Sequence, residues 1–149
     1  MRDIIFRGKR LDNGEWVEGD YFRKYIYDRY DDGSLHHLIG WQVTDNDGEK
    51  FNDYEDVDPD TVGQYTGMKD KNGKKIFEGD IFKDYSGIVR SIFRVPGGLA
   101  FEDNPVSFGY DHRAPVYPYS SIAEMQNASW LSKYCEVVGN IHDNPDLLK

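Results

Sequence analysis

The stretch YTGMKDKNGKKIFEGDIFK at residues 65–83 decides the fold, because a similar stretch, FRGKRLDNGEWVEGDYFR, occupies residues 6–23. The two align through an Asn-Gly pair and a Glu-Gly-Asp triplet, with one residue of slack between them. The aligned positions are Gly8 with Gly67, Asn13 with Asn72, Gly14 with Gly73, Glu18 with Glu78, Gly19 with Gly79, Asp20 with Asp80, and Phe22 with Phe82. The alignment predicts two related β-units; two unrelated hairpins that share turn residues are the alternative.

Each copy predicts a β-hairpin followed by a bend. Asn-Gly between apolar runs is the strongest local hairpin signal, because a type I′ turn needs positive φ at both central residues. The glycine of Glu-Gly-Asp interrupts the returning strand, and a glycine there is typical of a bulge or a tight bend. We therefore expect the order strand, turn, strand, bend, strand in both copies.

The first half of the chain predicts strands at residues 3–10, 16–27 and 35–43, the last from its strict alternation of apolar and polar side chains. Residues 45–60 are rich in acids and predict a loop. A strand is expected to follow at residues 61–66. We accordingly divide the chain into an N-terminal β-unit, residues 1–60 with an acidic loop at 45–60, and a C-terminal unit, residues 61–149.

The second half predicts further strands at residues 87–95, 99–102 and 134–141. One short helix is expected at residues 122–131, because Ser121 and Glu124 form a capping box before an apolar helical face. This order of elements is compatible with a small, strongly bent SH3-like barrel, which would remove exposed strand edges. The predicted fold class is therefore mainly β, with the barrel as the second unit.

Three blocks of sequence resemble the YopX family of phage and prophage proteins. They are GDYF at residues 19–22, VGQYTGMKDKNGKKIFEGDIFK at residues 62–83 and EVVGNIHDNPDLL at residues 136–148. The resemblance implies a small, soluble protein that is intracellular in its bacterial host and oligomeric. It implies no activity and no catalytic residue.

Cysteine content and the N-terminal sequence bear on location. The single cysteine, Cys135, excludes an intrachain disulfide and favours a reducing compartment. It is interpreted as a buried strand residue rather than a nucleophile. The chain begins without an apolar run, so no signal peptide or membrane span is expected. These observations predict a cytoplasmic protein of the bacterial host.

The net charge of −9 is unevenly distributed. Residues 45–60 hold eight acids against Lys50 alone. Nonspecific nucleic-acid binding depends on cations that neutralise phosphates, so it is not expected here. The acidic stretch is open to two interpretations: a solvated loop, or a surface that attracts basic partners or mimics a phosphate backbone.

Searches for catalytic and metal-binding patterns give no assignment. Gly67 and Gly73 have the wrong spacing for a phosphate-binding loop, and His36 and His37 should point to opposite faces of a strand. We therefore predict no catalytic residue, no cofactor and no metal site. The carboxylates of the two Glu-Gly-Asp triplets leave an enzyme of unknown reaction as a remote alternative.

The aromatic content predicts self-association. Eight Phe, eleven Tyr and three Trp make the chain 15% aromatic, and residues 16–27 carry aromatics on both faces. Aromatic side chains are enriched at interfaces. The candidate interface residues are Trp16, Tyr21, Tyr25 and Tyr27. The leading hypothesis is a non-enzymatic homo-oligomer that binds another macromolecule, with a host or phage protein as the candidate partner. The alternative from another class is an acidic inhibitor of a host nucleic-acid-binding protein.

Overall fold

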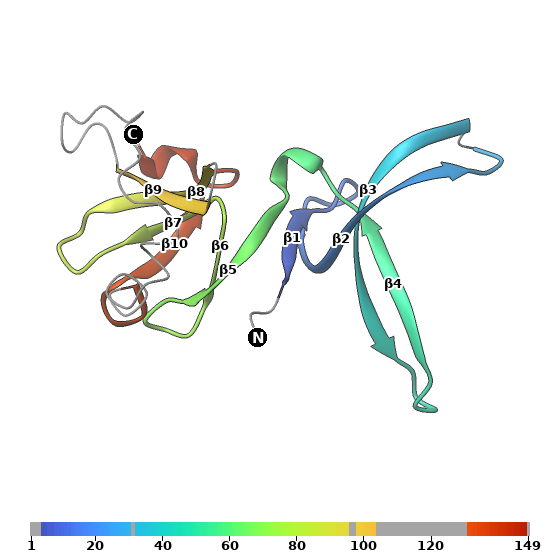
Figure 1. Ribbon diagram of the computed structural model, residues 1–149, viewed down its shortest axis with the longest axis horizontal. Helices are drawn as coiled ribbons and strands as arrows, with labels where there is room; N and C mark the ends of the chain where they lie inside the picture. Colours follow the sequence, from blue (N-terminus) through green and yellow to red (C-terminus); the bar gives the residue numbers. More distant parts are fainter. Residues whose placement is uncertain (1–3, 31, 96–97, 104–130, 149) are drawn as a thin grey trace. The chain divides into compact units, whose positions relative to one another are not determined.

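The computed structural model describes residues 4–30, 32–95, 98–103 and 131–148 of the chain (Figure 1). The chain divides into two compact units, Met1–Gln64 and Tyr65–Lys149. The described residues are mainly in β-strands, as the sequence predicts. Among them, no helix has both the length and the apolar character needed to cross a membrane.

Unit 1 consists of a short strand and two long hairpins that share a strand. Its elements are β1 (Phe6–Lys9), β2 (Trp16–Tyr27), β3 (Asp32–Thr44), β4 (Lys50–Asp56) and the 3-10 turn η1 (Pro59–Thr61). Antiparallel pairing sets Tyr25 opposite Leu35 in the first hairpin and Gly40 opposite Tyr54 in the second. In Figure 1 the β2–β3 and β3–β4 hairpins diverge from β1. Leu38, Ile39 and Val57 are almost fully buried where the hairpins meet.

The strand β5 (Gly63–Lys69) begins in unit 1 and ends in unit 2. Its first two residues pair with β1, and its later residues pair with β6 (Lys75–Phe77). The hydrogen-bonded order β4-β3-β2-β1-β5-β6 makes a six-stranded antiparallel sheet.

Unit 2 contains a second antiparallel sheet and a compact core. The sheet has the order β10-β7-β8-β9, with β7 at Asp80–Lys83, β8 at Val89–Val95, β9 at Gly98–Asp103 and β10 at Glu136–Asn140; the 3-10 turn η2 (Pro145–Leu148) follows. Met68 packs against a buried cluster made of Ile76, Phe82, Ile92, Leu131, Cys135 and Val137. Burial raises the pKa of the Cys135 thiol to about 12, so the thiol is protonated at neutral pH.

The predicted SH3-like barrel is not found in the part of the chain that the structure describes. The second sheet is open there, with β10 and β9 at its two ends. Alternating apolar residues predict strands but not whether the last strand pairs with the first, which depends on contacts far apart in sequence. Residues 131–134 are helical, and the rest of the predicted helix at 122–131 lies outside the described residues.

The prediction of a loop over residues 45–60 is wrong at its centre, where β4 forms. Seven successive pairs join β4 to β3, from Leu38 opposite Asp56 to Thr44 opposite Lys50. Asp, Asn and Glu disfavour strands intrinsically, but strand propensity depends strongly on the partner strand. The regular alternation of β3 provides that partner; of the acids on β4, Asp53 is exposed, whereas Glu55 and Asp56 are half-buried and pair with Arg10 and His36.

The type I′ turns predicted at the two Asn-Gly pairs are also wrong. Gly14 and Gly73 have φ of 71° and 80°, whereas no non-glycine residue of the described chain has positive φ. At the second copy, the Gly73 N–H donates to the Asp70 carbonyl and the Asp70 N–H to the Lys74 carbonyl. This is the three-residue hairpin loop that ends in a left-handed glycine.

The same loop occurs three times in the part of the chain that the structure describes, each time with an aspartate at its start. In every case one carboxylate oxygen accepts hydrogen bonds of 2.8–3.0 Å from the backbone N–H groups two and four residues later. The loops are Asp45–Glu49, Asp70–Lys74 and Asp84–Ile88, and their glycines, Gly48, Gly73 and Gly87, have φ of 80–85°. An Asp-x-x-Gly pattern thus fixes three of the hairpins.

Candidate functional site

The two aligned copies share a left-handed glycine in the hairpin connection, but the connection closes between Arg10 and Glu15 in the first copy and between Asp70 and Lys74, one residue shorter, in the second. Asn13 and Asn72 each precede a left-handed glycine in a connection between strands. Gly67, however, has φ of 84° at an irregularity of β5, whereas Gly8 lies in β1, where an added Cβ would touch Val57 at 3.1 Å.

The Glu-Gly-Asp triplets have different backbone conformations. Glu18, Gly19 and Asp20 lie within β2, and a Cβ on Gly19 would overlap the Gly40 carbonyl oxygen on β3. Glu78 and Gly79 instead form the turn between β6 and β7, with φ of 86° at Gly79.

Asp80, the last residue of the second triplet, is 1% exposed and accepts a 2.8 Å hydrogen bond from the Phe77 N–H. Its carboxylate therefore stabilises the turn. Within the described residues, no group of three or more His, Cys, Asp or Glu side chains could hold a metal ion.

The four candidate interface residues fall into two pairs. The Trp16 ring lies under the guanidinium of Arg7, whose Cζ is 4.6 Å from the ring centroid. The Tyr21 hydroxyl is 2.6 Å from Nδ1 of His37, and the two rings stack. Tyr25 and Tyr27, in contrast, are 61% and 74% exposed. The structure thus uses the first pair within the chain and leaves the second pair accessible.

Tyr25 and Tyr27 belong to a hairpin segment rich in exposed apolar groups, residues 20–30 and 32–39, which we call the arm. Its exposed large side chains are Phe22, Tyr25, Tyr27, Tyr30 and Leu35. Tyr25 and Leu35 face each other across the strand pair. A two-stranded ribbon has two faces and cannot cover both by itself, so these groups have no place to be buried within the arm.

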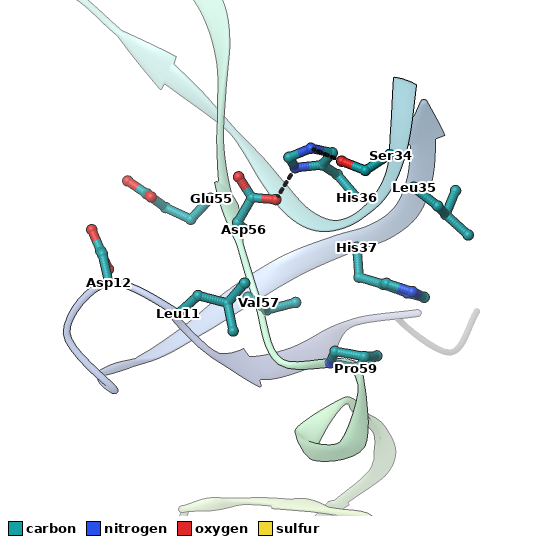
Figure 2. A pocket seen from close by; sticks show the side chains of 10 residues that line it. All are labelled: Leu11, Asp12, Ser34, Leu35, His36, His37, Glu55, Asp56, Val57 and Pro59. Atoms are coloured by element: carbon teal, nitrogen blue, oxygen red, sulfur yellow. Dashed lines mark hydrogen bonds and ion pairs between the residues drawn. The ribbon is translucent and has the colours of Figure 1, made fainter. Parts of the chain in front are cut away.

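A pocket of about 590 Å³ lies at the base of the arm (Figure 2). Its walls combine apolar, imidazole and carboxylate side chains: Leu11, Asp12, Ser34, Leu35, His36, His37, Glu55, Asp56, Val57 and Pro59. His36 Nδ1 is 2.6 Å from Asp56 Oδ1, and its Nε2 is 3.2 Å from Ser34 Oγ. Figure 2 shows His37 on the other side of the strand from His36, as the alternation predicted.

Ser34, His36 and Asp56 are linked in the same order as the residues of a serine hydrolase triad: the hydroxyl contacts the imidazole, and the imidazole contacts the carboxylate. A triad also requires hydrogen-bond donors that stabilise an oxyanion, so the series by itself establishes only a polar network. Sequence reasoning missed it, because His36 and Asp56 come together only through the pairing of β3 with β4. No spacing of residues in the sequence predicts the pairing of β3 with β4.

At the rim of the pocket, Arg10 joins two carboxylates. Its guanidinium lies 2.6 Å from Asp12 Oδ2 and 3.2 Å from Glu55 Oε1. The hydrogen bond from Arg10 lowers the pKa of Asp12. Asp12 is thus a stable anion at the pocket rim, engaged by its own chain.

Comparisons with known proteins place the chain by family. The model of the family described as YopX protein matches residues 5–149, nearly the whole sequence. The chain belongs to the YopX family. Among solved structures, this YopX chain is similar to the crystal structure of protein EF1440 from Enterococcus faecalis, at 24% sequence identity, a TM-score of 0.49 and 100% coverage of both chains. Comparison with curated proteins found no match.

Proposed function

We propose that this YopX chain is a non-enzymatic, oligomeric, β-rich protein of a phage or prophage that binds another macromolecule in the host cytoplasm. The observation that carries the proposal is the exposure of the aromatic and apolar side chains of the arm. The phage setting comes from the family resemblance.

The exposed side chains of the arm are large, and two of them, Tyr25 and Leu35, lie directly opposite each other on the strand pair. Scattered apolar residues are normal on a surface, but contiguous exposed patches are typical of interaction sites. Tyrosine suits such a site, since its ring buries a large area and its hydroxyl remains polar. Tyr30 is 91% exposed, and Tyr25 and Tyr27 more than half exposed. Association would remove this surface from water.

Light scattering coupled to size exclusion, run over a wide range of protein concentrations, tests the oligomer. The expected mass is a multiple of the 17.3 kDa chain mass and falls toward one chain on dilution. A variant with Tyr25→Ser and Tyr27→Ser should dissociate at higher concentration. Phe51→Ser is the matched control, because Phe51 is similarly exposed, at 49%, on the other hairpin. A mass of one chain at every concentration would contradict the proposal.

A second candidate function is favoured by the β3–β4 hairpin. Asp53 lies on β4, and Asp45, Asp47 and Glu49 lie in the adjoining loop, all of them exposed. Several carboxylates gathered on one hairpin can present negative charge to a basic surface. This arrangement supports an acidic inhibitor of a host nucleic-acid-binding protein.

Affinity capture from host cells, read by mass spectrometry, separates the two candidates. A nucleic-acid-binding protein that is lost when Asp47, Glu49 and Asp53 become amides supports the inhibitor. A partner that is lost with the arm variant and kept with the amide variant supports the leading proposal.

A further inference from the structure

Over the second half of β2, the described residues supply a partner strand on one side only. On one side β2 pairs with β3 from Asp20 to Tyr27, and on the other it pairs with β1 only from Trp16 to Gly19. Beyond Gly19, no strand of the described chain lies on the β1 side of β2. The backbone of residues 20–27 therefore presents hydrogen-bonding groups on that side, and such an edge is a template for another strand.

The composition of this edge does not oppose pairing. Natural proteins protect long edges with prolines, bulges or charges that repel a second copy. Residues 20–27, DYFRKYIY, contain no proline, and their only charged residues are Asp20, Arg23 and Lys24. The register irregularity between Ile26 and Tyr27 places its extra residue, Gly33, on β3 and not on β2. The other residues of this edge are aromatic or β-branched, and such residues stabilise strand pairs across an interface.

We propose that the β2 edge pairs antiparallel with the β2 edge of a second copy of this chain, with the two Tyr25 residues opposite each other on a two-fold axis. The pairing extends the sheet from one copy into the next. It rests on the oligomer proposed above and specifies the strand and register of that oligomer.

Sterics and charge select this register. In an antiparallel pair of strands, residues directly opposite each other point to the same face of the sheet. A two-fold axis perpendicular to the sheet must therefore pass between two copies of the same residue. An axis at Arg23 would bring Tyr27 of the second copy opposite Gly19, where Phe6 of β1 already lies. An axis at Lys24 would set the two lysines opposite each other, and like charges in that position destabilise a sheet.

An axis at Tyr25 avoids both problems and makes favourable pairs. Tyr25 faces Tyr25 of the second copy, and Arg23 faces Tyr27 of the second copy, a cation–aromatic pair. Lys24 faces Ile26 of the second copy, so no like charges are opposed. An axis at Ile26 would leave only residues 25–27 of β2 in the ladder. The Tyr25 register is therefore the longest that sterics and charge permit.

The strand β4, which lies at one end of the same sheet order, provides a comparison. Its sequence, KFNDYED, would oppose two carboxylates if an axis passed through Asp53, Tyr54 or Glu55. Like charges therefore disfavour these three registers of β4, whereas an axis at Asn52 would oppose no like charges within residues 50–54.

Site-directed cysteine cross-linking tests the register. The background is the full chain with Cys135→Ser, which removes the buried native thiol. Opposed Cα atoms of antiparallel strands are about 4.5–5.5 Å apart, within disulfide range. Under mild oxidation Tyr25→Cys should form a covalent dimer roughly tenfold faster than Tyr27→Cys, because the opposed thiols have a raised effective concentration. In this register the two residues 27 are roughly 13 Å apart along the strands.

A second pair of variants tests the same register at two positions that lie away from the two-fold axis. Arg23→Cys and Tyr27→Cys should cross-link with each other when mixed, and neither should cross-link efficiently alone. Equal rates for Tyr25→Cys and Tyr27→Cys, or no preference for the mixed pair, would overturn the register. If light scattering shows an oligomer while Tyr25→Cys and the mixed pair fail to cross-link, the proposed oligomer stands and this pairing is wrong.

Discussion

Unit 1 and unit 2 treat their apolar side chains differently. Unit 2 buries Ile76, Phe82 and Ile92 completely, in one cluster with β10 and the helical residues 131–134. Unit 1 buries Leu38 and Ile39 at the base of its hairpins and leaves the rings of Tyr25, Tyr27 and Tyr30 exposed on the arm. The difference teaches that units of similar aromatic content can bury their rings in a core or leave them exposed on a hairpin.

The largest expected effect on the free energy of unfolding is the difference between removing a buried aromatic ring and removing an exposed one. Phe82→Ala should reduce the free energy of unfolding by about 3–5 kcal/mol, because it removes a fully buried ring and leaves a cavity. Tyr25→Ala is the matched control and should change it by less than about 0.5 kcal/mol at concentrations where the chain is monomeric. Denaturant unfolding of both variants measures the two values, and equal losses would contradict the distinction between the units.

The next effect concerns the third Asp-x-x-Gly loop, in unit 2. Asp84 accepts hydrogen bonds from the Ser86 and Ile88 N–H groups and pairs with Arg90 at 2.7 Å, with its side chain 4% exposed. Asp84→Asn should reduce the free energy of unfolding by about 2–3 kcal/mol at pH 7, since charge-assisted bonds are lost. Asp45→Asn is the control, because its equivalent loop in unit 1 is exposed.

The effect of Asp84 should depend on pH in a defined direction. Burial alone would raise the Asp84 pKa, but hydrogen bonds from Ser86 and then Arg90 outweigh it and lower the pKa below the ordinary value of 3.8. The ionised Asp84 carboxylate therefore contributes its full amount to the free energy of unfolding above pH 3.8. This contribution disappears as the pH falls through the lower pKa that Asp84 has in the folded state. The stability difference between the natural chain and Asp84→Asn should narrow in acid. A constant difference between pH 3 and pH 7 would show that the ion pair does not stabilise the fold.

A smaller effect distinguishes the two glycines of the Glu-Gly-Asp triplets. Gly79→Asn should cost about 1 kcal/mol, because asparagine tolerates the left-handed backbone and an added Cβ comes no nearer than 3.5 Å to Ile141. Gly19→Asn should cost more, about 1–3 kcal/mol, since its Cβ would overlap the Gly40 carbonyl oxygen. Comparable losses in thermal unfolding would mean that the two triplets are structurally alike after all.

The sequence predicted those parts of the fold that depend on local pattern. The dense run of aromatics at residues 16–27 and the strict alternation of residues 35–43 predicted the strands β2 and β3. The two Asn-Gly pairs predicted the β1–β2 and β5–β6 hairpins. The turn type did not follow, because Asp70 satisfies the loop N–H groups through its side chain and only Gly73 needs positive φ. The Asp-x-x-Gly pattern carries that information.

The rest depends on pairing between distant residues. β4 is acidic and forms only against β3, so composition alone predicted a loop. The pocket could not be predicted for the same reason, since His36 and Asp56 are twenty residues apart and meet across that ladder. The aromatic run at residues 16–27 did single out the arm, but not which of its rings the chain would use internally.

Hydrogen exchange of the full chain tests the central claim, that the arm is completed by a second copy, most directly. The account predicts that peptides from residues 20–30 gain protection as protein concentration rises, because the outer amides of β2 enter an intermolecular ladder. Peptides from residues 50–56, which include the acidic edge of β4, should exchange at the same rate throughout. Exchange of residues 20–30 that does not change from the lowest to the highest concentration would contradict the account.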